Sequence, residues 1–205
     1  MSVYVKNYLP PEINKKEILR YAGVTAATND VRILMDECLA LCLDSISYNV
    51  CYSILPITCD AERINLGFAV TDSKALAKNL GGCDSIVLFV ATLGSGLDRL
   101  IARYSALSPS KAFMLQAIGA ERIEALCDTF NQEITSELNN RSKITVPRFS
   151  AGYGDLPLEL QKDICRVLDC QRKIGVALQE SLVMLPTKSV SAIIGIKDQE
   201  TRDES

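Results

Sequence analysis

The apolar run over residues 86–91 constrains the fold of this chain more than any other feature. It reads Ile-Val-Leu-Phe-Val-Ala and lies within a nearly continuous apolar segment from Asp84 to Thr92. A strand with one face in water alternates apolar and polar residues, whereas a strand buried on both faces does not. We therefore predict a strand here that other elements cover on both faces.

Helix and strand signals along the rest of the chain predict an α+β fold. The expected strands span residues 47–58, 64–70 and 188–196, and the expected helices span residues 12–21, 29–43, 72–80 and 109–138. The strands are rich in Tyr, Val and Ile, and the longest helix carries an apolar stripe at steps of three or four residues. Because strands and helices do not alternate regularly, the pattern argues against a Rossmann sheet.

Two glycines follow the central apolar run, in the sequence Gly94-Ser95-Gly96. A phosphate-binding loop at a helix N-terminus would need a third glycine, but Arg99 stands in its place, and no Walker lysine follows. We interpret this segment as a tight turn between a strand and a helix.

Length and charge exclude several classes of protein. The 205 residues predict one domain, and apolar residues make up 48% of them, enough for a substantial core. A net charge of −3 argues against nucleic-acid binding and against attraction to an anionic membrane. With neither an apolar stretch that could span a bilayer nor a signal-peptide pattern at residues 1–7, we expect a cytoplasmic protein.

The chain contains eight cysteines and no histidine. None of the cysteines forms a Cys-x-x-Cys pair, so we interpret them as small buried residues in a reducing compartment, the alternative being an iron–sulfur or zinc site. The absence of histidine excludes a Ser-His-Asp or Cys-His relay and every metal centre with a histidine ligand.

The segment from Arg148 to Pro157 is the strongest candidate for a ligand-binding loop. An arginine offers a planar fork that suits a carboxylate, and Gly152 lets a ligand approach the backbone closely. Tyr153 adds a flat apolar face with a polar tip. The alternative is an ordinary turn between a strand and a helix.

Two further positions carry candidate polar contacts. Glu124 lies on the shoulder of the apolar stripe of the longest helix, where it either reaches water at the edge or faces a cleft. Ser189 and Ser191 fall on one face of the last expected strand, opposite Val190. They leave room for a bulky ligand, or they belong to a plain solvated strand face.

Two spaced motifs resemble the activation domain of cobalamin-dependent methionine synthase. The first is Arg148-x-x-x-Gly152-Tyr153, and the second is the Glu-Ser, apolar, Pro, Ser-Val-Ser pattern of residues 180–191. The resemblance extends over about residues 83–195. It implies a mainly antiparallel sheet with packed helices in a bent, C-shaped single domain. We expect a weakly matching N-terminal part over residues 1–80, the activation-domain core over residues 81–197, and a polar tail over residues 198–205.

The resemblance also implies a function. In this family S-adenosylmethionine donates a methyl group to cobalamin that has lost its activity and been reduced by one electron. The implied partner is a corrinoid protein, a methionine synthase that lacks its own activation domain, with a separate protein as electron donor. The chain would then be an accessory component of that methyltransferase.

Site residues follow from the same resemblance. The S-adenosylmethionine-binding residues are expected to be Glu124, Arg148, Ser150, Gly152 and Tyr153. Arg148 would hold the carboxylate of the donor, Glu124 would complement its positive charge, and Ser150 and Gly152 would offer backbone contacts. The residues facing cobalamin are expected to be Tyr153, Ser189 and Ser191. No metal ligand and no catalytic side chain is expected.

The sequence departs from the family pattern after Tyr153. The family has an acid in a Pro-Asp/Glu-His context where this chain has Gly154-Asp155-Leu156-Pro157, and neither its N-terminal aspartate nor its last tyrosine pair has a match. These differences leave two alternatives open. One is a module that docks on a corrinoid protein without methyl transfer of its own, and the other is an unrelated small-molecule-binding protein with the same fold.

Overall fold

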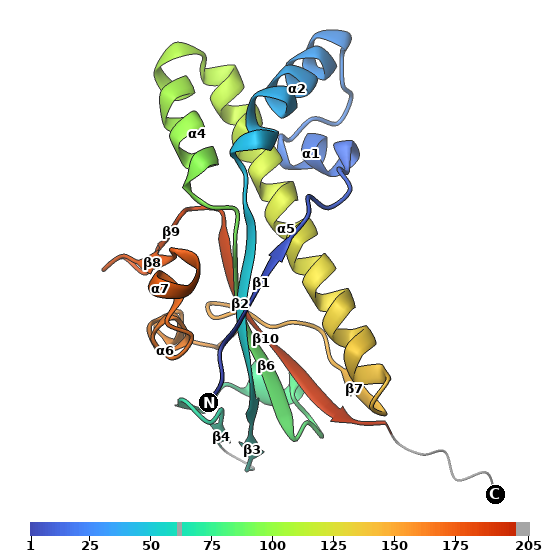
Figure 1. Ribbon diagram of the computed structural model, residues 1–205, viewed down its shortest axis with the longest axis vertical. Helices are drawn as coiled ribbons and strands as arrows, with labels where there is room; N and C mark the ends of the chain where they lie inside the picture. The colour runs from blue at the N-terminus through green and yellow to red at the C-terminus, as the bar shows by residue number, and fades with distance from the viewer. Residues whose placement is uncertain (61–62, 200–205) are drawn as a thin grey trace, which may run out of the picture.

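The computed structural model describes residues 1–60 and 63–199, and one antiparallel sheet runs through its centre (Figure 1). The strand order is β1 (Tyr4–Tyr8), β2 (Tyr48–Pro56), β6 (Ser85–Thr92), β10 (Ser189–Asp198) and β7 (Lys143–Thr145). Every neighbouring pair is antiparallel. The N-terminal part of the chain therefore supplies two strands of the same sheet as the C-terminal part, and the predicted α+β class is confirmed.

The remaining elements are helices and short strands around this sheet. The helices are α1 (Lys15–Tyr21), α2 (Asn29–Cys42), α3 (Lys74–Asn79), α4 (Ser95–Leu107), α5 (Pro109–Asn139), α6 (Leu160–Val167) and α7 (Cys170–Ile174), with a 3-10 turn η1 (Leu43–Ser45). The short strands are β3 (Thr58–Cys59), β4 (Ile64–Asn65), β5 (Val70–Thr71), β8 (Ala177–Leu178) and β9 (Met184–Leu185). None of the helices described here combines the length and apolar character needed to cross a bilayer.

Strand β6 occupies the middle of the sheet, as its apolar run predicts. It pairs with β2 on one side and with β10 on the other, so that Cys51, Val90 and Ser191 stand in one row across three strands. From Ile86 to Thr92 every residue of the strand is buried. The prediction of a strand covered on both faces is confirmed.

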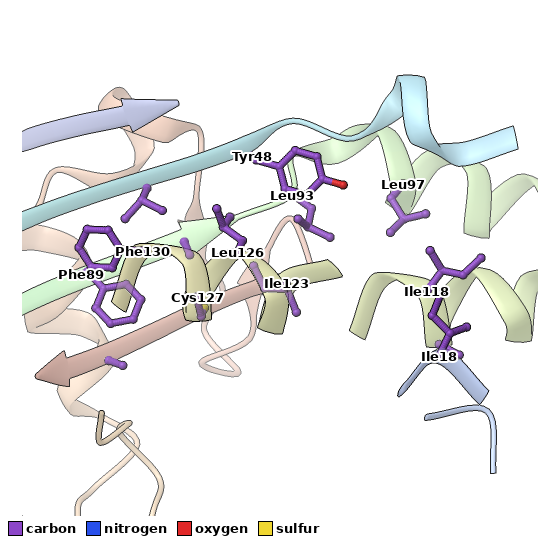
Figure 2. Close-up of a cluster of buried hydrophobic side chains, with 14 of the residues drawn as sticks. Ile18, Tyr48, Phe89, Leu93, Leu97, Ile118, Ile123, Leu126, Cys127 and Phe130 are labelled. Atoms are coloured by element: carbon purple, nitrogen blue, oxygen red, sulfur yellow. The ribbon is translucent and has the colours of Figure 1, made fainter. Parts of the chain in front are cut away.

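The first face of the sheet carries the larger core, shown in Figure 2. Side chains from α1, α2, α4 and α5 meet there with alternate residues of β2, β6 and β10. The rings of Phe89 on β6 and Phe130 on α5 lie 4.8 Å apart, a spacing that favours aromatic packing. The first part of helix α5 packs among α1, α2 and α4, and its later part runs along this face of the sheet (Figure 1).

The second face is covered by α3, α6, α7 and the loop after β7. Its core includes Ile86, Leu88 and Val90 of β6, together with Leu160 and Ile164 of α6. These residues alternate with those facing α5, which is why the central strand has no polar residue between Ile86 and Ala91.

Three predicted boundaries differ from the structure. The segment 64–70 forms two short strands, because Gly67 takes a φ of +79° and Leu66 N–H bonds to the carbonyl of Ala69, which closes a turn. The first helix begins at Lys15 rather than at residue 12, because Asn14 caps it. Of the expected polar tail, Asp198 belongs to β10, and residues 200–205 lie outside the described part of the chain.

The Gly94-Ser95-Gly96 segment forms the predicted strand-to-helix turn. Gly94 has a φ of +71°, a value that L side chains rarely adopt. A Cβ at Gly96 would lie 1.9 Å from the carbonyl oxygen of Ser45, so only glycine fits where α4 meets η1.

Candidate functional site

The segment that carries the arginine–glycine–tyrosine motif is fixed to the sheet at one end. The N–H and the carbonyl of Phe149 each form a 2.8 Å hydrogen bond with the backbone of Ile193 on β10. Beyond it the chain turns sharply, because Gly152 and Gly154 have φ values of +86° and +56°. This turn directs Tyr153 outward, where its side chain is 71% exposed.

The acid that follows the motif fixes the other end. The carboxylate of Asp155 accepts hydrogen bonds from the N–H groups of Lys74 and Ala75 at 2.8 and 3.2 Å, and from the hydroxyl of Ser73. The Ser73 hydroxyl, followed by the backbone N–H groups, lowers the pKa of Asp155. In this chain the acid anchors the loop to the start of α3, so the loop is held at both ends.

Arg148 pairs with two carboxylates on the flank of α5. Its Nη2 lies 2.6 Å from Oε2 of Glu124, and its Nη1 lies 2.6 Å from Oδ1 of Asp128. Partial burial of Arg148 acts against its charge, but the hydrogen bond to Asp128 and the neighbouring negative charges together outweigh this effect and raise the pKa of the guanidinium. The three side chains form a cluster with a net charge of −1.

A cavity of about 280 Å³ opens beside this cluster. It is lined by Glu124, Arg148, Phe149, Ser150, Tyr153 and Val190. The structure thus brings together four of the five residues predicted for the donor site. The fifth, Gly152, shapes the turn of the loop and is not part of this lining.

A second cavity, of about 440 Å³, adjoins the first and shares Glu124 with it. It lies between α5 and the segment that leads into α1. Its lining includes Glu12, Asn14, Glu17 and Asp128. Carboxylates dominate this surface, so the two cavities together favour a ligand with positive charge.

The segment before α1 is held in place by a buried ion pair. Arg122 is fully buried, and its guanidinium donates to the carbonyls of Pro11 and Glu12 at 2.6 Å each and to the carboxylate of Glu121. Glu121 in turn accepts from the N–H of Asn14 at 3.0 Å. Polar groups that are paired in this way can be buried without a large cost, and these bonds fix the segment before α1 against α5.

Sequence reasoning missed Asp128 and the N-terminal wall of the site. Asp128 follows Glu124 by four residues, and this spacing places two side chains on one face of a helix, so the helical period alone could have identified it. The contribution of Glu12 and Asn14 depends on a contact with α5 more than 100 residues away, for which the sequence carries no local signal.

Ser189 and Ser191 do not join these cavities. Val190, which lines the first cavity, points to the face of β10 that packs toward α5, and the two serines point to the opposite face. Ser191 is 2% exposed, which conflicts with the expectation that it faces a docked cobalamin. Ser189 is half-buried and bonds to Thr92 and to the carbonyl of Pro186.

The cysteines are distributed over both cores. Cys38, Cys42, Cys51, Cys127 and Cys170 are buried, while Cys59 is exposed. Among the residues that the structure describes, no group of three or more cysteine or carboxylate side chains is placed to hold a metal ion.

Two comparisons with known proteins match this chain, one by its sequence and one by its fold. The sequence profile of the family described as "Vitamin B12 dependent methionine synthase, activation domain" matches residues 62–202. Among the solved structures that match is one described as "Crystal Structure of the MetH Reactivation Domain bound to AdoHcy", with a TM-score of 0.68 and 14% sequence identity. That match covers 100% of this chain and 81% of the solved chain. No curated protein matches the sequence significantly.

Proposed function

Because this chain belongs to the family of vitamin B12-dependent methionine synthase activation domains, we propose that it binds S-adenosylmethionine and supports the reductive methylation of inactive cob(II)alamin on a partner protein. The observation that carries the proposal is the cluster of Arg148, Glu124 and Asp128 beside two adjoining cavities. The solved MetH reactivation domain, which shares the fold, carries AdoHcy, the demethylated product of that donor.

The charges of the cluster suit this ligand. S-adenosylmethionine carries a positive sulfonium and a positive amino group against one carboxylate, so its net charge is +1. The cluster has a net charge of −1, and neither of its carboxylates is fully buried, with side-chain exposures of 41% for Glu124 and 62% for Asp128. Negative charge on the wall of a site offsets part of the cost of moving a cation from water into that site.

Each site residue has a proposed role. Arg148 would bind the carboxylate of the donor in one of two ways. It would use an N–H that bonds to neither Glu124 nor Asp128, or it would give up its hydrogen bond to the more exposed Asp128. Glu124 would lie near the positive charge, and Ser150 would offer a backbone contact at the cavity floor. Tyr153 packs edge-on against Phe149 at 6.2 Å, and it would cover the ligand or meet the corrin.

Cobalamin would arrive on a partner protein. A corrin with its side groups is much larger than either cavity, and the chain has no histidine with which to ligate cobalt. The corrin would supply the methyl-accepting centre, and the residues of this chain would hold and orient the donor. We propose as partner a methionine synthase without an activation domain of its own, with the electron supplied by a separate protein.

Titration calorimetry tests the binding step. Wild-type protein should give saturable heat with S-adenosylmethionine, and Arg148→Gln should weaken binding by about 2 kcal/mol, the range of a charge-assisted pair. Arg32→Gln, at an exposed site on α2, serves as the matched control and should bind like the wild type. Absence of saturable heat at millimolar donor would refute donor binding.

A labelling experiment tests the reaction. The protein is mixed with a cob(II)alamin-loaded partner, a reductant and methyl-labelled S-adenosylmethionine, and labelled methylcobalamin is measured. Transfer should require this protein and fall sharply with Arg148→Gln. If the protein binds the partner but transfer is equally fast without it, the chain is a docking module without a role in methylation.

A further inference from the structure

Three cysteines from distant parts of the chain meet on the second face of the sheet. Cys51 lies on β2, and its sulfur is 3.8 Å from the sulfur of Cys170 at the start of α7. Cys165 on α6 lines the same small cavity as Cys170. Cys51 and Cys170 are fully buried, while Cys165 is partly exposed. The three sulfurs therefore lead from the surface into the core.

The surface end of this row is accessible. A cavity of about 330 Å³ is lined by Cys165, Cys170 and Arg166, and by the residues that run from α7 into β8. It lies on the opposite side of the sheet from the donor cavities, because Cys51 faces the second core while Glu124 lies on the helix that covers the first. A small reagent can therefore reach Cys165 without entering the donor site.

Cys165 has the properties of a reactive thiol. Cys165 is partly exposed in a cavity that it shares with Cys170, and this neighbouring thiol lowers the pKa of Cys165, while burial acts in the opposite direction. By contrast, burial raises the pKa of Cys38, Cys42 and Cys127. Thiolates rather than thiols attack electrophiles, and reactive cysteines are partly exposed with a second thiol nearby.

We propose that Cys165 and Cys170 form an oxidation site, in which Cys165 reacts with a hydroperoxide and Cys170 closes a disulfide with it. In the first step the sulfur of Cys165 takes one oxygen from the hydroperoxide and becomes a sulfenic acid, and the peroxide is reduced to water or an alcohol. In the second step the thiol of Cys170 attacks that sulfur, the S–S bond forms, and water leaves. The two thiols supply both electrons.

Cys51 provides a second position for the same disulfide. Its thiol can attack Cys170 and release Cys165, which exchanges one S–S bond for another without further oxidation. The two sulfurs of a disulfide lie about 2 Å apart, and those of Cys51 and Cys170 start 3.8 Å apart in this structure. The first disulfide joins α6 to α7, and the second joins α7 to the sheet.

Peptide mapping of the full chain tests this proposal directly. Trypsin cleaves after Arg166, so Cys165 and Cys170 fall on separate peptides, 163–166 and 167–172. After brief treatment with hydrogen peroxide and alkylation of free thiols, the cross-linked pair of peptides should appear in the folded protein. Cys59, which is exposed but outside the row, should stay largely alkylated. In Cys165→Ser the link should be lost, and in Cys170→Ala a dimedone adduct should accumulate on Cys165.

Two results would overturn the proposal. One is oxidation of Cys59 at a rate equal to that of Cys165 in the wild-type protein, which would mean that exposure alone decides reactivity. The other is formation of the 163–166 to 167–172 link at an equal rate in concentrated guanidinium, which would mean that sequence proximity suffices. Both use unmodified protein, so they hold even if a cysteine variant fails to fold.

Discussion

Arg122 Nη1 donates a 2.6 Å hydrogen bond to the main-chain carbonyl of Pro11, which connects the middle of α5 to the segment before α1. The guanidinium that makes this contact is fully buried. One side chain therefore both stabilises the core and sets the position of the N-terminal wall of the acidic cavity.

Replacing Arg122 with methionine should destabilise the protein by about 3 to 5 kcal/mol, because Glu121 would remain buried without its partner. Denaturant unfolding measures the loss. The double variant Arg122→Met with Glu121→Leu should recover part of it. If the double variant were less stable than the sum of the two single losses predicts, the unpaired buried charge of Glu121 would not be the cause.

Glu124→Gln should reduce the preference of the site for a sulfonium. In the wild type, S-adenosylmethionine should bind more tightly than its uncharged thioether product, because Glu124 and Asp128 favour the positive charge. The substitution should reduce the ratio of the two affinities, donor over product, by about fivefold, as expected for a half-exposed charge pair. Calorimetry with both ligands checks it, and Glu137→Gln, farther along α5, should leave the ratio unchanged.

Asp155→Asn should make stability less dependent on pH in the acidic range. The folded-state pKa of Asp155 is lowered, first by the Ser73 hydroxyl, so its contribution is present above the unfolded pKa of about 4 and is lost as pH falls below it. Thermal unfolding between about pH 6 and pH 3 should therefore show a smaller drop in Tm for the variant. Asp72→Asn, at a neighbouring exposed carboxylate, should show the same drop in Tm over this pH range as the wild type.

Gly96→Ala should destabilise the fold by about 2 kcal/mol or more, because the added methyl group would collide with the carbonyl of Ser45. Gly81→Ala is the matched control, since a Cβ there meets its nearest atom at an ordinary 3.6 Å. Chemical denaturation of both variants gives the comparison. Equal stabilities would show that α4 can shift away from η1 at little cost.

Local patterns in the sequence predict the central strand and the long helix well, because a continuous apolar run and a helical apolar stripe can both be recognised within a short segment. They do not predict β1, whose residues 4–8 show no regular alternation of apolar and polar side chains. This edge strand is defined by pairing with β2, whose partner residues lie at least 40 positions away. Pairing over such distances leaves little local signal.

The candidate site divides in the same way. Arg148, Ser150 and Tyr153 lie within one short segment, and their spacing alone marks them as a group. Glu12, Asn14 and the row of Cys51, Cys165 and Cys170 come together only when separate elements pack, so no window of the sequence contains them. The burial of Ser191 likewise depends on which core covers that face of β10.

The position of β10 between β6 and β7 has a consequence for synthesis of the protein. Strand β6 is complete by residue 92, but its partner on one side begins only at Ser189. During translation nearly 100 further residues must therefore be synthesised before this edge of the apolar run 86–91 can be paired. An unpaired edge of this kind is a template for aggregation. A nascent chain that stalls before β10 should depend on chaperones that mask this strand.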